Sequence, residues 1–397
     1  MATFSVSFLG CKVSHTDAHA VREHLLADGH EERAAGAADV AVVNTCCVTH
    51  EALRKSRHAA ARAARAHSRV YVTGCGANLA ADAFAGLPEN VVVVPRRSEE
   101  TPAFVAGDVG AIGCVQSDAR LDRVRAFVKV QDGCSFSCAF CVIPLVRGAS
   151  RSRRAEAVLA EVRRRVTQGH REVVLTGINL GCYRDREAGY ALPRLVREAA
   201  ATPGLGRLRL SSIEVNHLTE ELAETLRAAP RIARHLHVPL QSGDDSILET
   251  MGRRYDSATY LRRVGLVRGF NLTTDVIVGF PGEDERAFRR TCDVVEEAGV
   301  SAVHVFPYSP RPGTVTAAAD TVPLAVKRER SARLRALSRE ASLRRWREKI
   351  GRDDVVLVDR PGRGYGDDYS PWLVSGPVGE LIPVRGHGVT EEGILAA

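Results

Sequence analysis

The feature that most constrains the fold is a repeated alternation of short apolar runs with longer helical patterns through the middle of the chain. Strands that alternate with helices in this way form parallel β-α-β units, because two parallel strands need a long crossover between them. Six such runs predict a complete or partial barrel. They cover residues 126–130, 172–175, 207–210, 236–240, 274–278 and 302–306.

Polar residues and glycines follow the ends of several of these runs. Gly177, Ser212, Gln241 and Gly279 each come at or just after the end of an apolar run. In barrels built from β-α units, the loops at the carboxyl ends of the strands carry the chemistry. We therefore expect a binding site at this end of the predicted barrel.

The first hundred residues show the same alternation, with apolar runs at 4–9, 40–43, 70–72 and 91–94. Cys11, Cys46 and Cys75 follow the first three of these runs at intervals of 35 and 29 residues, each about one β-α unit. Because the carboxyl ends of parallel strands meet at one edge of the sheet, the three thiols are expected to meet in space.

Length and composition predict an ordinary globular protein of several domains. The chain has 397 residues, of which 45% are hydrophobic and 26% charged, and this argues against disorder or a coiled coil. No apolar run approaches the roughly 20 residues that cross a bilayer, and no secretory signal is visible. We expect a cytoplasmic protein without membrane contact, whose cysteines are reduced. The predicted domains cover residues 1–115, 120–350 and 351–397, the last a small β module.

The net charge of +7 is concentrated in one segment. Residues 326–349 contain ten Lys or Arg and three Glu, and Leu334, Leu337 and Ala341 recur there at helical spacing. This predicts an amphipathic helix with a basic outer face, which either is only solvated or faces RNA. A loop rich in Arg and Ser offers a second basic region with the same two interpretations. The candidate phosphate contacts are Arg333 and Arg344 of the helix and Arg147, Arg151 and Arg153 of the loop.

The most informative motif is C-x3-C-x2-C, formed by Cys134, Cys138 and Cys141 directly after the first run of the predicted barrel. Iron-sulfur clusters are usually held by four thiolates, so a cluster held by three keeps one iron open to another ligand. The alternatives are a structural zinc site or buried reduced cysteines. Zinc would normally need a fourth Cys or His nearby in the sequence, and none is obvious, so the motif favours a cluster.

Together with this motif, six further segments resemble those of the radical S-adenosylmethionine (SAM) methylthiotransferases. The resemblance spans nearly the whole chain and implies an N-terminal methylthiotransferase domain, a central radical SAM (β/α)6 partial barrel and a C-terminal TRAM-like β module, an α/β architecture with parallel sheets. The segments are Leu-Gly-Cys-Lys-Val at 9–13, Val-Asn-Thr-Cys at 43–46, Leu-Thr-Gly at 175–177, Val-Pro-Leu-Gln-Ser-Gly-Asp at 238–244, Asp-Val-Ile-Val-Gly-Phe-Pro-Gly-Glu at 275–283 and Val-Phe-Pro-Tyr-Ser-Pro-Arg at 305–311.

The resemblance implies two [4Fe-4S] clusters. Cys134, Cys138 and Cys141 correspond to the ligands of the cluster that binds SAM, whereas Cys11, Cys46 and Cys75 correspond to those of an auxiliary cluster that carries the sulfur. Cys47 stands beside Cys46, and although the match of Asn-Thr-Cys favours Cys46, either could be the ligand. Ser14 and His15 replace the Asn and Gln usual in the family. Residues expected to contact SAM are Gly177, Ser212, Glu214, Gln241 and Gly279, although Gly177 and Gly279 could also simply make turns and Glu214 could be a surface carboxylate.

The function implied by the resemblance is transfer of a methylthio group to C2 of N6-threonylcarbamoyladenosine at position 37 of tRNA. One SAM would supply the radical and a second the methyl group. The implied partners are the anticodon stem-loop of tRNA, an electron donor such as flavodoxin or ferredoxin, and a sulfur donor. Alternative substrates are N6-isopentenyladenosine-37 tRNA and an aspartate of a ribosomal protein. A non-catalytic iron-sulfur protein that binds RNA or transfers electrons is the rival from another class.

Other cysteines and histidines fit ordinary structural roles better. His235 and His237 could share one face of a strand as metal ligands, but a packing or hydrogen-bonding role is favoured. Cys114, Cys182 and Cys292 have no partner at ligand spacing and are expected to be small buried side chains.

Overall fold

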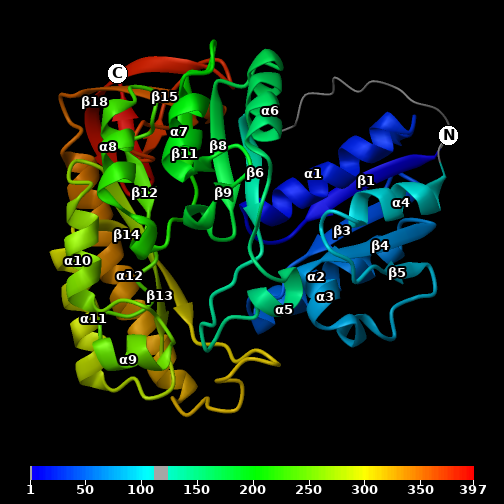
Figure 1. Ribbon diagram of the computed structural model, residues 1–397, viewed down its shortest axis with the longest axis horizontal. Helices are drawn as coiled ribbons and strands as arrows, with labels where there is room; N and C mark the ends of the chain where they lie inside the picture. Colours follow the sequence, from blue (N-terminus) through cyan, green and yellow to red (C-terminus); the bar gives the residue numbers. More distant parts are fainter. Residues whose placement is uncertain (1, 111–123) are drawn as a thin grey trace. The chain divides into compact units, whose positions relative to one another are not determined.

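The computed structural model describes residues 2–110 and 124–397. These residues form two compact units (Figure 1). The first, called here the N-terminal unit, contains residues 2–110 together with Asp132–Ser150 and Ser309–Ala317. The second, called the barrel unit, contains residues 124–131, Arg151–Tyr308 and Ala318–Ala397.

A parallel five-stranded sheet forms the centre of the N-terminal unit, with strand order β2-β1-β3-β4-β5. The chain order therefore confirms the predicted β-α-β alternation. The strands are β1 (Thr3–Phe8), β2 (Glu31–Glu32), β3 (Val40–Thr45), β4 (Arg69–Gly74) and β5 (Val91–Val93).

Helices cover both faces of this sheet. Val21 and Leu25 of α1 pack against Phe4 on one face, while Ala60 of α2 packs with Val43 on the other. Helix α2 begins where the side chain of Thr49 accepts a hydrogen bond from the backbone N–H of Ala52, a standard N-cap. The helical elements are α1 (Lys12–Ala27), α2 (His50–Ala64), α3 (Cys75–Leu79), η1 (Ala81–Phe84), α4 (Thr101–Val109) and α5 (Ile143–Arg147).

Six parallel strands form a partial barrel and follow one another in the order of the six apolar runs. This confirms the barrel predicted from the sequence. Their pairing is β6-β8-β11 on one side and β12-β13-β14 on the other. A parallel bridge between Leu208 and Ile232 joins the two groups, and the short β7 (Arg151–Ser152) lies at the outer edge of β6. The six are β6 (Arg125–Asp132), β8 (Glu172–Gly177), β11 (Arg207–Leu210), β12 (His235–His237), β13 (Asn271–Val278) and β14 (Val300–Pro307).

The main core of the barrel unit lies between these strands and their surrounding helices. Val276 of β13 and Val303 of β14, for example, belong to the same cluster as Phe288 of α11 and Leu334 of α12. The helices are α6 (Ala155–Thr167), α7 (Leu192–Ala200), α8 (Glu220–Ala228), α9 (Asp245–Thr250), α10 (Ser257–Gly265), α11 (Glu285–Glu297) and α12 (Leu324–Arg347). Short elements between them are η2 (Leu180–Cys182), β9 (Arg184–Asp185), β10 (Tyr190–Ala191) and η3 (Val215–His217).

Helix α12 is the basic helix expected at 326–349, but not all of its basic residues face outward. Lys327 and Arg330 lie on the buried face with Leu334 and Ala341. The guanidinium of Arg330 pairs with the buried carboxylate of Glu283 at 2.7 Å. A buried cation needs such a partner, so part of the charge serves packing within the barrel unit.

A closed five-stranded barrel completes the chain, where the sequence predicts a small β module. Trp372 is fully buried in its core with Val356 and Ile394. At the end of the partial barrel where its strands begin, Glu172 pairs with Arg125, Arg207 and Arg209. Arg207 also donates to the backbone carbonyl of Val355 in the closed barrel at 2.9 Å. The strands are β15 (Asp353–Arg360), β16 (Arg363–Tyr365), β17 (Pro371–Leu373), β18 (Leu381–Thr390) and β19 (Gly393–Ala396).

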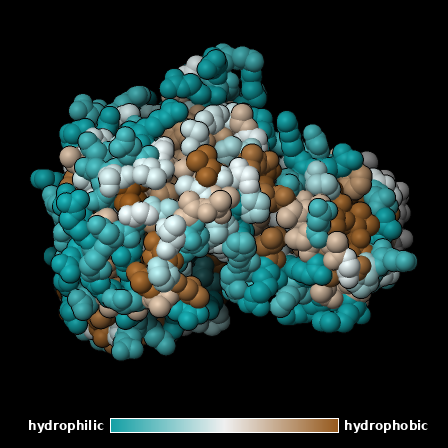
Figure 2. All heavy atoms as spheres, turned by 90° about the horizontal axis from the view of Figure 1, so that it is seen from below, coloured by the Kyte–Doolittle hydropathy of each residue, from teal (hydrophilic) through white to brown (hydrophobic). Residues whose placement is uncertain are grey.

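The surface is predominantly polar on the face shown in Figure 2, with apolar side chains in small groups. Within residues 2–110 and 124–397, no helix combines the length and apolar character needed to span a membrane.

Candidate metal and cofactor site

The three cysteines of the N-terminal unit follow neighbouring strands that end in register. Phe8 of β1 lies opposite Asn44 of β3, which in turn lies opposite Thr73 of β4. Cys11, Cys46 and Cys75, called here the N-terminal trio, come two or three residues beyond these positions. The sheet therefore gathers at one edge three residues that are far apart in the sequence, as the spacing predicts.

Two glycines let the loops of the N-terminal trio approach closely. Gly10 has a φ of +122°, and a Cβ added to it would lie 3.2 Å from the Cβ of Cys46. Gly74 has a φ of +84°, and its added Cβ would lie 2.4 Å from the side-chain oxygen of Asn44. Residues other than glycine rarely adopt such φ values. Backbone conformation and space thus both require glycine at these positions.

The electrostatics of the N-terminal trio confirm that its thiols are neighbours. The pKa of Cys46 is raised to about 11, mainly by burial and also by the nearby negative charges of Cys75 and Cys11, against a hydrogen bond from the backbone of Val48. Mutual repulsion of thiolates is relieved when they share a cation or a metal cluster. Three converging sulfurs, two of them on buried residues and the third on the exposed Cys11, are a donor set that suits a cluster held by three thiolates.

Cys47 lies in the same region and is fully buried. It packs with Cys75, Val142 and Val146. A hydrogen bond between the two thiols lowers the pKa of Cys75 and, together with burial, raises that of Cys47. This arrangement gives Cys47 a supporting position, and Cys46 as the ligand stays a prediction.

Arg147 is not at the surface, which corrects its interpretation as a phosphate contact. Its side chain is buried, and Nε donates to the sulfur of Cys75 at 3.1 Å. The two remaining nitrogens bond to Asp17 at 2.8 Å and to Asp132 at 3.0 Å. A guanidinium with these partners has no face left for RNA. The local sequence, an Arg in a basic loop, carried no signal for this long-range pairing.

The second set of cysteines, called here the loop trio, lies between β6 and α5 in the N-terminal unit. Gly133 has a φ of +68°, and an added Cβ would lie 2.2 Å from the carbonyl oxygen of Ala149. The backbone N–H of Cys134 donates to the carbonyl of Gly148 at 3.0 Å, and that of Cys141 donates to Cys138 at 3.0 Å.

All three residues of the loop trio are partly exposed, unlike the buried Cys46 and Cys75. The backbone N–H of Phe136 points at the sulfur of Cys134 at 3.4 Å, the kind of contact that stabilises a cluster thiolate. Thr316, in the segment Ser309–Ala317, donates its backbone N–H to the carbonyl of Ala139 at 3.1 Å. The loop therefore has a fixed backbone and accessible thiols, which suits a cluster with one open position.

The predicted SAM contacts occupy the same end of the partial barrel. Gly177 ends β8, and a Cβ there would come within 3.0 Å of the side-chain oxygen of Gln131, which accepts from the backbone of Asn179. Gly279 directly follows β13 and has a φ of +70°, where an added Cβ would lie 2.4 Å from Lys327. Both glycines permit close packing, so they would be needed with or without SAM.

Gln241 has an unusual backbone, with a φ of 68° although it is not glycine. Its N–H donates to the carbonyl of Asp275 at 2.8 Å, and its own carbonyl accepts from Ile277 at 2.9 Å, which fixes this conformation. Ser212 follows β11 and is partly exposed. Strained non-glycine residues are concentrated at functional sites, so this position stays a candidate.

Glu214 is not a surface carboxylate, since its side chain is 10% exposed. It accepts from the backbone N–H of Asn216 at 2.9 Å and pairs with Arg253 at 3.4 Å. These contacts cap η3 and hold the carboxylate at the strand-end side of the barrel.

The other candidate RNA contacts are more accessible than Arg147. Arg153 is 38% exposed and bonds to Glu161, and Arg333 is 42% exposed and bonds to Glu285 and Glu329. Arg151 is partly exposed, and Arg344 is exposed. Arg153 and Arg333 would have to exchange carboxylate partners for phosphate, whereas Arg344 is positioned on the outer side of α12.

Sequence reasoning did not identify one polar cluster inside the partial barrel. His237 of β12, Asp275 of β13 and His304 of β14 have ligand atoms within 4.8 Å of one another. His235 instead bonds to Thr273.

The remaining cysteines have separate surroundings. The sulfur of Cys182 lies 3.2 Å from Nε2 of His217, and Cys292 is partly buried. Cys114 lies outside the described residues.

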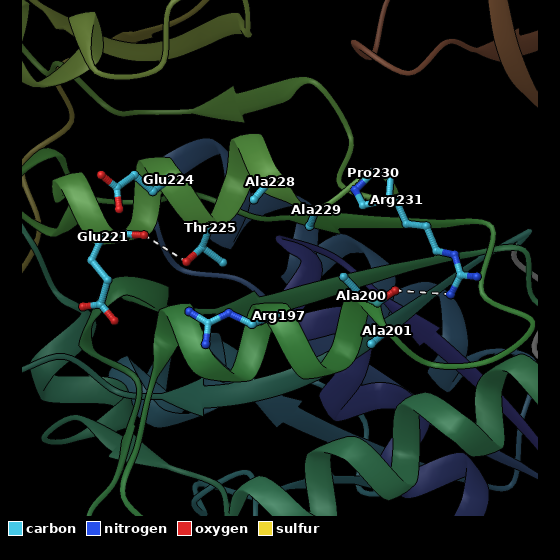
Figure 3. Close-up of a pocket in the computed structure, with 10 residues that line it drawn as sticks. All are labelled: Arg197, Ala200, Ala201, Glu221, Glu224, Thr225, Ala228, Ala229, Pro230 and Arg231. Atoms are coloured by element: carbon cyan, nitrogen blue, oxygen red, sulfur yellow. Dashed lines mark hydrogen bonds between the residues drawn. The ribbon is translucent and has the colours of Figure 1, made fainter.

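A groove of about 630 Å³ on the outer side of the barrel unit contains none of the predicted site residues. Figure 3 shows that α7 and α8 form its walls, with Arg197 on one side and Glu221 and Glu224 on the other. Hydrogen bonds within this region, such as Thr225 to the carbonyl of Glu221 at 2.9 Å, stabilise the helices themselves.

Family models match both units. The radical SAM superfamily matches residues 128–295, and the model described as uncharacterized protein family UPF0004 matches residues 3–94. The radical SAM assignment implies a [4Fe-4S] cluster and SAM as cofactors. The first match covers most of the partial barrel, and the second covers the sheet that carries the N-terminal trio.

Curated relatives extend the similarity to the whole chain. The threonylcarbamoyladenosine tRNA methylthiotransferase MtaB of Thermotoga maritima is 33% identical over 100% of this chain and 97% of its own length. The protein of the same name from Bacillus subtilis is 37% identical over 85% of this chain and 80% of its own length. A tRNA-2-methylthio-N(6)-dimethylallyladenosine synthase of Nitratidesulfovibrio vulgaris is 32% identical over 96% of this chain and 92% of its own.

Solved structures support the fold. The radical SAM methyltransferase TsrM from Kitasatospora setae superimposes with a TM-score of 0.59 at 17% identity, over 80% of this chain and 77% of TsrM. At this identity the likeness concerns the fold alone. The two thiol trios, the parallel sheet architecture and the full-length similarity to curated relatives lead to one conclusion: the chain belongs to the radical SAM methylthiotransferase family.

Proposed function

We propose that this protein attaches a methylthio group to C2 of N6-threonylcarbamoyladenosine at position 37 of tRNA, as a transferase of sulfur-containing groups. The observation that carries the proposal is the presence, in one compact unit, of two separate trios of thiols. An electron-transfer protein has no use for clusters that lack a protein ligand, whereas a methylthiotransferase needs one open iron for SAM and another for sulfur.

The loop trio is proposed to hold the SAM-binding cluster. A cluster bound there would supply the one-electron chemistry for reductive cleavage of SAM, with the electron coming from the proposed electron donor. The chain contributes the rigid loop, fixed by the contact between Cys134 and Gly148, and the partial exposure that lets SAM reach the open iron. Gly177, Ser212, Glu214, Gln241 and Gly279 are proposed to line the SAM site at the strand ends of the barrel.

The N-terminal trio is proposed to hold a second [4Fe-4S] cluster, which supplies the sulfur. The need for radical chemistry follows from the substrate, because an aryl C–H bond offers no leaving group and no acidic proton. Cys46 and Cys75 are buried while Cys11 is exposed, and the Arg147 guanidinium compensates the negative charge of Cys75. A second SAM is proposed as the methyl donor, with Cys46 rather than Cys47 as the third ligand.

The relatives support the proposed choice of threonylcarbamoyladenosine as the substrate nucleoside. Proteins named for threonylcarbamoyladenosine are 33 to 37% identical to this chain, and those named for dimethylallyladenosine are 31 to 33% identical. The exposed basic residues, including Arg344, are proposed to contact the anticodon stem-loop. An electron donor of the flavodoxin or ferredoxin class and a sulfur donor are further proposed partners.

The direct test is mass spectrometry of tRNA nucleosides from a deletion strain of the source organism. We expect the 2-methylthio form of threonylcarbamoyladenosine to disappear and its precursor to accumulate, and the intact gene to restore it. Unchanged levels of the methylthio nucleoside would reject the proposed substrate. A change in the dimethylallyl derivative would instead assign the chain to the sibling activity.

A second test separates the enzyme from a non-catalytic iron-sulfur protein. Anaerobically reconstituted protein is mixed with SAM and a strong reductant, and 5'-deoxyadenosine is measured by chromatography. We expect cleavage that depends on the loop trio. Two assembled clusters without any cleavage would favour the non-catalytic alternative.

A further inference from the structure

We infer that His237, Asp275 and His304, called here the barrel triad, recognise the polar substituent on N6 of the target adenosine and so select threonylcarbamoyladenosine over its isopentenyl counterpart. The inference rests on the proposed function and adds the residues that distinguish between substrates. It is carried by the position, accessibility and hydrogen bonding of the three side chains.

Three adjacent parallel strands bring the barrel triad together. Asp275 of β13 lies directly opposite His304 of β14 in the strand register. One carboxylate oxygen of Asp275 lies 3.1 Å from Nε2 of His237 and 3.3 Å from Nδ1 of His304. The two imidazole rings are stacked, with their centroids 5.2 Å apart.

The barrel triad faces the interior of the partial barrel. Side chains alternate between the two faces of a strand. Val276 and Val303, the neighbours of Asp275 and His304, pack in the core shared with α11 and α12, and these helices lie on one side of the strands (Figure 1). Asp275 and His304 therefore point to the other, concave side.

The interior beside the barrel triad is open. The side chain of His304 is 62% exposed, although it stands in the middle of a barrel strand. Phe306, two residues further along the same face of β14, is 38% exposed. An exposed aromatic ring suits stacking on a base, and a neighbouring imidazole suits a polar group attached to that base.

The barrel triad also lies close to the predicted SAM site. The backbone carbonyl of Asp275 accepts from the N–H of Gln241 at 2.8 Å. Gln241 is the strained residue at the end of the barrel where the strand-end loops gather. A base that meets SAM at this end would bring its N6 substituent into the neighbourhood of these strands.

Hydrogen bonds define which atoms of the barrel triad face a substrate. His237 is held on both sides, by Asp275 and by the hydroxyl of Thr273 at 2.9 Å from Nδ1. Burial opposes ionisation of Asp275, but hydrogen bonds from the two histidines outweigh it and lower the pKa of the carboxyl, which is therefore ionised. It then accepts from Nδ1 of His304, and the second ring nitrogen, Nε2, is the atom that can bond to a ligand.

The two candidate substituents differ in what they offer this nitrogen. The threonylcarbamoyl group carries a urea, a hydroxyl and a carboxylate, whereas the isopentenyl group is a hydrocarbon. A polar site that loses its water to a hydrocarbon is left without hydrogen bonds, and such sites reject the apolar analogue strongly. The barrel triad therefore favours the threonylcarbamoyl substrate.

The test uses reconstituted full-length protein and synthetic anticodon stem-loops with threonylcarbamoyladenosine, isopentenyladenosine or plain adenosine at the target position. Wild type is compared with His304→Leu, His304→Gln and a matched control, His387→Leu, which replaces an exposed histidine of the C-terminal barrel. Affinity for each RNA is measured by fluorescence anisotropy without SAM. Methylthio product and 5'-deoxyadenosine formed without RNA are measured separately.

We expect wild type and His387→Leu to bind the threonylcarbamoyl RNA at least about 10-fold more tightly than plain RNA. His304→Leu should lose this preference and most of its kcat/KM, His304→Gln should keep part of it, and the control His387→Leu should cleave SAM without RNA as wild type does. Equal preference in wild type and His304→Leu would overturn the inference while leaving the proposed function intact.

Two further outcomes overturn the inference in other ways. Wild type that cleaves SAM but modifies no threonylcarbamoyl RNA would reject the proposed function itself. The ligand set of two imidazoles and a carboxylate also resembles a divalent metal site. A stoichiometric metal ion besides iron, found by elemental analysis in wild type and lost in His304→Leu, would assign the barrel triad to metal binding instead.

Discussion

The two thiol trios differ in how the chain builds them. The N-terminal trio is assembled from three strand ends across 64 residues of sequence, with Cys46 and Cys75 buried and Cys11 exposed, whereas the loop trio comes from eight consecutive residues and all of its cysteines are partly exposed. Contacts between residues far apart in the sequence support the N-terminal trio: Gly10 and Gly74 provide space, and Arg147 bonds to Cys75. Backbone hydrogen bonds within one loop support the second.

This difference matches the chemistry proposed for each trio. A cluster that must receive SAM needs accessible thiolates, while one that delivers sulfur to a radical reaction benefits from shielding against water. Arg147 connects the two, because it bonds both to Cys75 and to Asp132, two residues before Cys134. Local contacts thus create the site proposed to bind SAM, and tertiary structure creates the site proposed to hold sulfur.

The largest effect is expected from removing a ligand of the loop trio. Cys134→Ala should reduce iron from about eight to about four per chain and abolish formation of 5'-deoxyadenosine, because the SAM-binding cluster loses a thiolate. Cys46→Ala should show the same loss of iron but should cleave SAM within about twofold of wild type. Its methylthio product should be absent, since sulfur delivery fails. Iron analysis and chromatography of both products measure the contrast.

The outcome that contradicts this separation of roles is equally simple. If Cys46→Ala lost SAM cleavage as completely as Cys134→Ala while its fold, followed by circular dichroism, stayed intact, the two trios would act as one site. Cys292→Ala, which changes a partly buried cysteine on α11, is the control and should behave as wild type.

A smaller effect is expected at Arg147. Arg147→Leu leaves the carboxylates of Asp17 and Asp132 buried without their cation, a change that typically costs about 3 to 5 kcal/mol of stability. Arg147→Lys keeps the charge but cannot bond to three partners at once. We therefore expect the lysine variant to fold. Its affinity for the second cluster, or its methylthiotransferase activity, should fall by about 10- to 100-fold.

The measurement that isolates this role is made in a background where the loop trio is replaced by alanine. Only the cluster of the N-terminal trio then remains, and its reduction potential can be followed by electron paramagnetic resonance. Loss of the hydrogen bond from Nε to Cys75 should lower the potential, because the reduced, more negative cluster loses a donor. An unchanged potential in Arg147→Lys would make the arginine purely structural.

The amino-acid sequence predicted much of this arrangement, for reasons that differ between the regions. The apolar runs and their spacing predicted the six barrel strands and the meeting of Cys11, Cys46 and Cys75, because both depend on β-α periodicity alone. The loop trio was recognisable from spacing within a single segment. Fold class and family were therefore accessible from the order of the residues along the chain.

Contacts between distant side chains were not predictable in this way. Arg147 stands in a basic loop, and nothing in its neighbours indicates Asp17 or Cys75 as partners. The sequence favoured a packing or hydrogen-bonding role for His235 and His237 on one strand. It did not identify Asp275 as the ion-pair partner of His237, because Asp275 lies 38 residues away on the next strand. Strand register decides such pairs, and a single sequence does not contain it.

The smallest effect is expected at Cys47, and it decides which of two neighbouring cysteines is the ligand. A serine at this position keeps a hydrogen-bond donor toward Cys75, so Cys47→Ser should cost at most about 1.5 kcal/mol and retain about eight irons. Cys46→Ser should lose about half of the iron. The opposite pattern, with iron lost in Cys47→Ser and kept in Cys46→Ser, would move the ligand by one residue. The N-terminal trio would then be Cys11, Cys47 and Cys75, and Cys46 would become the supporting thiol.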